Sequence, residues 1–312
     1  AAEPESRGEA TRPVPRRIRP NRATAAGTSL EEIIAARDSE ALEALLADPC
    51  VVMHHPTSVT YGRREQLSTW KSIFRAEHFV YRREALAALG DSLELWRHWI
   101  SLSGLTDRYA ASFGLSDFEE IVIGEVDGRG RYRRFEIFAP DHLGHALARL
   151  YERNADLCPD DEDRSRAAAI ARSAGVMLGQ PDLAGTASVL APDVEFSDLR
   201  TVGFGTLHGA EAVLETIAAM MELSSDDSAH IDEVVVLEPD ALVVRWTNRG
   251  THVESGGAFE RNLCQLWIFD AAGLLSLWQQ FEVEHAAEAL LRFDERFSSA
   301  ETSAETASSG VP

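Results

Sequence analysis

Basic residues are scarce in this chain: 30 Lys and Arg stand against 51 Asp and Glu in 312 residues, which gives a formal net charge of -21. A surface of that sign repels the phosphate backbones of nucleic acids. Long apolar runs are also missing, and none approaches the roughly 20 residues that cross a bilayer. We therefore expect neither nucleic acid nor a membrane as a partner.

Cysteine is nearly absent, with only Cys50, Cys158 and Cys264. They are odd in number, far apart and without a CxxC or Cys/His pairing, which argues against a disulfide framework or a structural zinc site. Three reduced thiols favour the cytoplasm. The chain also lacks Walker A, GxGxxG, HExxH, GxSxG and EF-hand patterns, so we expect no cofactor and no metal.

The most informative feature that is present is an internal repeat. Val126–Arg153 aligns without a gap on Phe269–Arg296, and Leu46–Phe74 parallels Leu190–Ala218. The residues matched by the first alignment include Asp127 with Asp270, Gly130 with Gly273, Phe138 with Phe281, His142 with His285 and Arg149 with Arg292. A repeat of this length indicates a duplicated domain rather than a solenoid unit.

The repeat predicts a division of the chain into four parts. Residues 28–157 and 164–297 form two domains that we expect to pack as a pseudo-dimer. Residues 1–27 are rich in Pro and Arg and read as a disordered arm, and the low-complexity residues 298–312 read as a disordered tail. Both tails contribute little apolar surface to a core.

Hydrophobic periodicity predicts helices first and strands afterwards in the second copy. Helical spacing covers 165–177, 184–190, 210–221 and 283–296, and strand patterns cover 194–196, 234–237, 242–248, 263–269 and 274–281. Asp270 and Gly273 mark a short hairpin loop between the last two strands. This order predicts an α+β fold with a curved antiparallel sheet packed on N-terminal helices.

The element order, the Asp after a short strand and the Asp-x-x-Gly hairpin resemble the nuclear transport factor 2-like superfamily. More narrowly they resemble its SnoaL-like branch, where polyketide cyclases, ketosteroid isomerase and limonene epoxide hydrolase sit. The resemblance covers both halves and implies two tandem cone-shaped domains, each with a pocket for a hydrophobic small molecule. It is specific for the fold and weak for function, because one fold hosts many chemistries.

The resemblance places Asp198 where ketosteroid isomerase has its general-base aspartate, and we matched His55 to it in the first half. A carboxylate or imidazole in an apolar pocket has its pKa moved toward neutrality, which suits proton transfer. In each case the alternative is structural: Asp198 caps a turn, and His55 orders the loop before Pro56. His54, next to His55 in a strand-like segment, is expected to face the other way.

The last strand of each half supplies further candidates by its alternation. In the first half Arg134, Glu136 and Phe138 share one face, with Glu136 as a partner that orients His55. The substrate-binding candidates in the second half are Trp246, Gln265, Trp267, Gln279 and Phe281. Gln265 stands where the isomerase family has its second aspartate, and Val122 stands there in the first half, which argues against steroid-isomerase chemistry.

Two functions remain open from the sequence. One is a cofactor-independent enzyme of the isomerase, cyclase or epoxide-hydrolase type that uses general acid/base catalysis on a hydrophobic small molecule. The other is a non-catalytic ligand-binding or dimerisation module of a larger regulatory protein, which the linker-like Pro/Arg arm favours. A pocket with His55 or Asp198 pointing into it distinguishes the first from the second.

Overall fold

The computed structural model describes residues 15–104 and 116–296. In the first half, the elements are α1 (Arg22–Ala36), α2 (Ser39–Leu45), β1 (Leu46–His54), η1 (His55–Thr57), β2 (Val59–Gly62), α3 (Arg63–Ile73), β3 (His78–Leu89), β4 (Leu93–Ser103), β5 (Ser116–Val126), β6 (Tyr132–Phe138) and α4 (Leu143–Leu157). Helices come first and antiparallel strands follow, as the sequence predicts.

The second half repeats this order. Its elements are α5 (Asp161–Met177), α6 (Leu183–Val189), β7 (Leu190–Asp198), β8 (Gly205–His208), α7 (Ala210–Glu222), β9 (Ser224–Glu238), β10 (Ala241–His252), β11 (Ala258–Phe269), β12 (Leu275–Glu282), η2 (Val283–His285) and helical residues 286–296. The short strand β8 is an addition that the sequence analysis did not predict.

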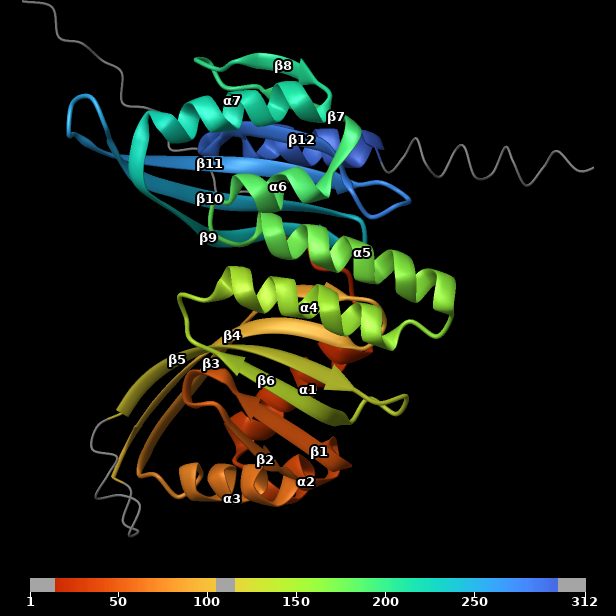
Figure 1. Ribbon diagram of the computed structural model, residues 1–312. Coiled ribbons are helices and arrows are strands. Elements are labelled where there is room, and N and C mark those ends of the chain that lie inside the picture. Colours follow the sequence, from red (N-terminus) through yellow and green to blue (C-terminus); the bar gives the residue numbers. More distant parts are fainter. Residues whose placement is uncertain (1–14, 105–115, 297–312) are drawn as a thin grey trace, which may run out of the picture.

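Each half contains one six-stranded sheet, and the two sheets have the same strand order: β2-β1-β6-β5-β4-β3 and β8-β7-β12-β11-β10-β9. The first strand of each half runs parallel to the last one, and the other pairs are antiparallel. The predicted α+β fold with two sheets is confirmed. Figure 1 shows one sheet above the other, with α4 and α5 between them.

The repeated Asp-x-x-Gly turn shows how local chemistry fixes this architecture. Asp127 Oδ1 accepts hydrogen bonds from the backbone N–H groups of Arg129 and Arg131, and Gly130 adopts a positive φ of 75° that disfavours side chains with a Cβ. In the second half Asp270 and Gly273 form the same turn. Both hairpins therefore set the same register between the last two strands.

Each sheet has two faces that pack differently, and we name them by their neighbours. The inner face packs on the N-terminal helices of its own half; in the first half it includes Trp96 and Phe135, clustered with Leu30 of α1. The outer face packs on the helix that closes the half; Phe138 clusters with Leu147 of α4. Because α4 also packs on α5, that cluster continues into the inner core of the second half.

The outer face of the second sheet is covered by helical residues 286–296. Phe281 and Val243 cluster there with Leu290 and Phe293 of that helix. Both closing helices therefore cover the outer face of their own sheet. Among the described helices, none is long and apolar enough to cross a membrane.

The predicted arm ends earlier than residue 27. Helix α1 already begins at Arg22, where the Asn21 side chain caps it. Before that helix, the Arg16 guanidinium donates to Glu84 Oε1 at 2.7 Å in the first half and to the Val234 carbonyl at 2.9 Å in the second. The prediction that residues 15–27 are disordered is therefore wrong. Residues 1–14 and the predicted tail at 298–312 lie outside the described residues.

Candidate functional sites

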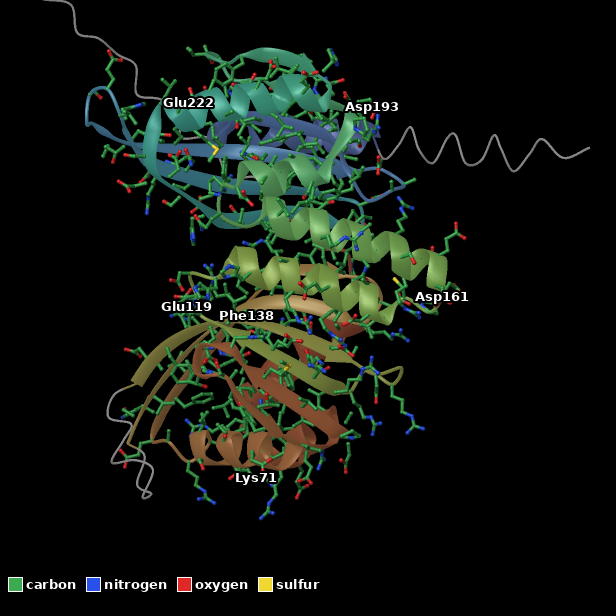
Figure 2. All side chains as sticks on the ribbon, viewed as in Figure 1. Lys71, Glu119, Phe138, Asp161, Asp193 and Glu222 are labelled. Carbon is green, nitrogen blue, oxygen red and sulfur yellow. The ribbon has the colours of Figure 1, made fainter. Side chains whose placement is uncertain are left out.

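The residues predicted for the first pocket come together, but on the outer face. His55 Nε2 lies 3.0 Å from Glu136 Oε2, and the His55 ring stacks on Phe138 with centroids 4.3 Å apart. Arg149 of α4 donates to both Glu136 oxygens, at 2.9 and 3.1 Å, and Arg134 Nη1 lies 3.4 Å from Oε1. This network fastens α4 to the sheet, and Figure 2 shows Phe138 at the sheet beneath that helix.

The electrostatics of Glu136 fit this structural position. Burial by itself raises the pKa of the Glu136 carboxyl, but hydrogen bonds from Arg149 and His55 and the positive charges of Arg149 and Arg134 lower it overall. The carboxylate is thus ionised, buried and fully engaged. The interpretation that the Phe138 face lines the pocket is wrong, because the alternate residues Phe135 and Ile137 pack with the inner core.

The same correction applies to the second half. Phe281 packs against the closing helix on the outer face, and Gln279, two residues earlier on β12, shares that side of the strand. Neither residue lines the cavity described below, whereas Trp246, Gln265 and Trp267 do. The sequence analysis thus grouped residues correctly within each strand but assigned the last strand to the wrong face.

The first half carries a polar cluster on its inner face that the sequence analysis did not identify: His54, His98 and Glu120. β4 and β5 place His98 directly opposite Glu120, and His98 Nε2 lies 3.0 Å from Glu120 Oε2. His54, the last residue of β1, reaches the other carboxylate oxygen with its Nε2 at 3.3 Å. One carboxylate therefore bridges two imidazoles.

The position of His54 follows from the register of the parallel strands. His54 pairs with Ile137 and Asp198 pairs with Gln280, which are equivalent positions of the repeat. The structural counterpart of Asp198 is therefore His54 and not His55. A slip of one residue moves a strand side chain to the opposite face, which explains why His55 lies outside. The alignment of Leu46 on Leu190, continued without a gap, already pairs His54 with Asp198.

The second half has a cavity of about 150 Å³ on its inner side. Most of its wall is apolar, and its aromatic and sulfur-containing members include Phe196, Trp246, Trp267, Trp278, Met220 and Met221. Polar side chains also line it, among them Gln265, Gln280 and Arg200 and the charged Asp182, Asp227 and Arg261. Trp278 Nε1 donates to Gln265 Oε1 at 3.1 Å, and Gln265 Nε2 lies 3.4 Å from Gln280 Oε1.

Asp198 is next to this cavity but does not line it. Its side chain is 0% exposed, and both oxygens accept hydrogen bonds from the Arg200 guanidinium at 2.8 Å. Burial raises the pKa of the Asp198 carboxyl, but the hydrogen bonds and charge of Arg200, with the Phe204 N–H, lower it overall. Asp198 is therefore an ionised, paired carboxylate, and Arg200 is the member of the pair that meets the cavity.

Two donors at this cavity have no partner. The Nε1 atoms of Trp246 and Trp267 are buried, and within the described part of the chain neither finds a hydrogen-bond acceptor. Buried N–H groups are almost always paired in folded proteins, since an unpaired one loses its water without compensation. The two indoles thus mark places where an acceptor is missing.

Comparison with known proteins finds a family match within the second half. The family model described as a SnoaL-like domain matches residues 174–278, which contain most of the cavity wall. Residues 174–278 form a SnoaL-like domain. This confirms the resemblance inferred from the sequence, and the identical order of the two sheets fits a tandem nuclear transport factor 2-like arrangement.

Solved structures match single parts of the chain. An NTF2-like protein of unknown function from Burkholderia pseudomallei is 24% identical over 34% of this chain and 82% of its own, with a TM-score of 0.28. An LEH-like epoxide hydrolase from M. tuberculosis is 18% identical over 36% and 78%, with a TM-score of 0.28. A putative SnoaL-like polyketide cyclase from Jannaschia sp. is 15% identical over 32% and 70%, also with a TM-score of 0.28. The comparison with curated proteins finds no match.

Proposed function

We propose that the SnoaL-like half binds a small, mostly aromatic molecule that carries an oxygen acceptor. The cavity of about 150 Å³ supports the size. A largely apolar cavity of roughly this volume accommodates one aromatic ring, and because the cavity is partly open to solvent, a second fused ring can extend from it. Three tryptophans in the wall favour a planar ligand, because aromatic rings stack or pack edge to face.

The unpaired indole N–H groups of Trp246 and Trp267 carry the proposal. A carbonyl, hydroxyl or carboxylate oxygen of the ligand satisfies at least one of them. Each such bond contributes about 0.5–1.5 kcal/mol to binding, which is roughly 2- to 12-fold in affinity. The ligand therefore needs both an apolar body and a polar edge.

In this proposal Arg200 donates a hydrogen bond to the ligand, and Asp198 holds Arg200 in position. Asp198 occupies Nε and Nη2 of Arg200, and within the described residues no acceptor is found for Nη1. A side chain held by two charge-assisted bonds is fixed in place, so it meets a ligand oxygen without further ordering. Asp198 is then a positioning residue rather than the general base that the resemblance implied.

Binding of naphthalene and 2-naphthol by the full chain tests the proposal. The two probes share a ring system and differ by one hydroxyl, and both are followed by calorimetry or by quenching of tryptophan fluorescence. We expect 2-naphthol to bind more tightly than naphthalene in the wild type. Trp267→Phe keeps an aromatic ring and removes the N–H, so it should abolish most of that difference and leave naphthalene binding nearly unchanged.

Trp99→Phe is the matched control, because Trp99 belongs to β4 of the first half and contributes nothing to this cavity. It should alter neither probe's affinity. Failure of both probes to bind the wild type contradicts the proposal. So does an equal affinity for both probes, because the unpaired donors then recognise no oxygen.

A further inference from the structure

We propose that an acidic seam between the two halves is a binding site for an extended arginine-rich segment, and that the chain's own residues 16–19 occupy it. The two strands at the seam, β3 and β9, are edge strands of their sheets and contact each other. The site is separate from the cavity of the second half and does not depend on the function proposed for that cavity. The acidic seam consists of the side chains of Glu84, Glu233, Glu238 and Asp294 and the backbone carbonyls of Ala85, Val234 and Val235.

Arg16 is the anchor of the bound segment, because every nitrogen of its guanidinium donates to the seam. Nη1 donates to Glu84 Oε1 at 2.7 Å and to the Ala85 carbonyl at 2.9 Å, both on β3. Nε donates to the Val234 carbonyl at 2.9 Å and Nη2 to Glu233 Oε1 at 3.4 Å, both on β9. The Arg16 side chain is only 15% exposed. One guanidinium therefore joins both halves, and a lysine with its single nitrogen cannot reproduce these bonds.

An irregularity in β9 supplies the main-chain acceptors. The register of β9 against β10 shifts between Val234 and Val236, so Val235 is an extra residue in the strand. In a regular strand successive carbonyls point to opposite sides. Here the Val234 and Val235 carbonyls both accept from the segment, the second from the Arg17 N–H at 2.8 Å. Arg17 also forms a parallel β-bridge with Val236, so the segment is bound partly as an added strand.

Arg17 and Arg19 make the outer contacts of the segment. Arg17 Nη1 donates to both oxygens of Asp294, at 2.6 and 2.9 Å, and Arg19 Nη1 lies 3.6 Å from Glu238 Oε2. These two arginine side chains are 47% and 77% exposed, so each adds less to binding than Arg16 does. The seam thus recognises the pattern Arg-Arg-x-Arg with acidic residues from two strands and one closing helix.

The occupant of the seam is exchangeable, because the rest of the fold is held without it. Asn21 caps α1 directly after the segment, and its side chain donates to the Gly90 and Leu93 carbonyls of the first half. The two halves also stay joined through the core cluster that α4 and α5 share. A chain with a net charge of -21 attracts basic segments. An Arg-Arg-x-Arg segment of a partner protein therefore competes with residues 16–19 for the seam.

A peptide of residues 14–21, VPRRIRPN, tests the proposal on the full chain. The tethered segment has an effective concentration of about 1 mM, so wild type should bind added peptide weakly. The double variant Arg16→Ala, Arg17→Ala releases the segment, and calorimetry should show peptide binding at least about 10-fold tighter than in wild type. Arg22→Ala is the matched control. It removes an arginine just beyond the segment, whose partner is Asp91, and should behave as wild type.

An Arg16→Lys peptide distinguishes recognition of a guanidinium from general attraction to negative charge. It has the same net charge as the first peptide and should bind the double variant at least about 10-fold more weakly. Adding Glu84→Gln to the double variant should weaken binding of the first peptide. Adding Asp91→Asn, which lies outside the seam, should not. Equal affinities for the two peptides overturn the proposal, because only charge is then recognised.

Amide hydrogen exchange gives a readout in wild type that needs no variant. The Arg17 N–H is bonded to the Val235 carbonyl, so its exchange is slowed while the segment is bound. Peptide at a concentration above that of the tethered segment should displace it and accelerate exchange of this amide, and the Arg16→Lys peptide should not. Unchanged exchange under these conditions overturns the proposal. So does a folded double variant that binds the peptide no better than wild type.

Discussion

The two halves share a backbone and differ in the chemistry of their inner faces. Where β4 and β5 place His98 opposite Glu120, β10 and β11 place Trp246 opposite Leu263. One half therefore presents a polar cluster at the position where the other presents an apolar wall. The strand order and the hairpin turns are unchanged between them.

At the next inner-face pair along the same strands, the polar residue belongs to the second half instead. Trp96 lies opposite Val122 in the first half, and Val244 lies opposite Gln265 in the second. The polar residue of the second half thus sits deeper along the strand, where it accepts from Trp278. A duplicated scaffold preserves packing and register, while a few inner-face positions decide what each copy does.

The outer faces differ in the same way. In the first half Glu136 accepts from Arg149 of the closing helix. In the second half Gln279 stands at the equivalent strand position, and the equivalent arginine, Arg292, lies 3.9 Å from Glu288 of its own helix. Both helices pack on their sheets, and in the first half the buried Glu136 and Arg149 add an ion pair to that packing.

Asp198→Asn gives the largest expected change in stability. It leaves Arg200, with a side chain only 17% exposed, without its counter-charge, and breaking such a pair costs about 3–5 kcal/mol. Urea unfolding at neutral pH measures the loss. Asp161→Asn, which removes the partner of Arg164 at the exposed start of α5, is the control and should change little.

The difference in stability between wild type and Asp198→Asn should depend on pH in one direction. The folded-state pKa of Asp198 is lowered, so its stabilising contribution is present above the unfolded value and is lost as pH falls through the folded value. From about pH 7 to about pH 3, across the ordinary aspartate pKa, the gap between wild type and Asp198→Asn should narrow. A gap that widens on acidification contradicts the ion-pair assignment.

Gln265→Val places on the inner face of the second half the residue that the first half has there. We expect it to cost less stability than Asp198→Asn. The change leaves Trp278 Nε1 without its acceptor, and a donor orphaned in this way costs about 1–3 kcal/mol. Gln279→Val is the matched comparison on the outer face. Gln279 Oε1 is buried and already unpaired, so its removal should be neutral or stabilising. Equal costs for the two variants contradict the distinction between the faces.

Much of the fold could be predicted from the sequence because its signals are local. The Asp270 and Gly273 turn and the helical spacing of 165–177 act within a few residues, and both are present as predicted. The ordering of Arg16 could not be predicted in this way. Its partners Glu84 and Val234 lie 68 and 218 residues away, so local composition carries no information about them.

The candidate sites were predicted only in part, for a reason of geometry. Trp246, Gln265 and Trp267 were assigned to one pocket, and they line the same cavity. The face of the last strand could not be assigned, because Phe135 and Phe138 are both apolar and each has a core to pack in. Alternation gives the two sets of residues but not which set faces the N-terminal helices.

His55→Ala has the smallest expected effect and separates the two neighbouring histidines of the first half. Glu136 keeps two bonds from Arg149 after the change, and the His55 side chain is 37% exposed, so the loss should be about 1 kcal/mol or less. His54→Ala instead removes a ring that is only 23% exposed and contacts both Glu120 and Thr57, so it should cost more stability than His55→Ala. Urea unfolding measures both variants. A larger loss of stability in His55→Ala than in His54→Ala would contradict the assignment of the two faces.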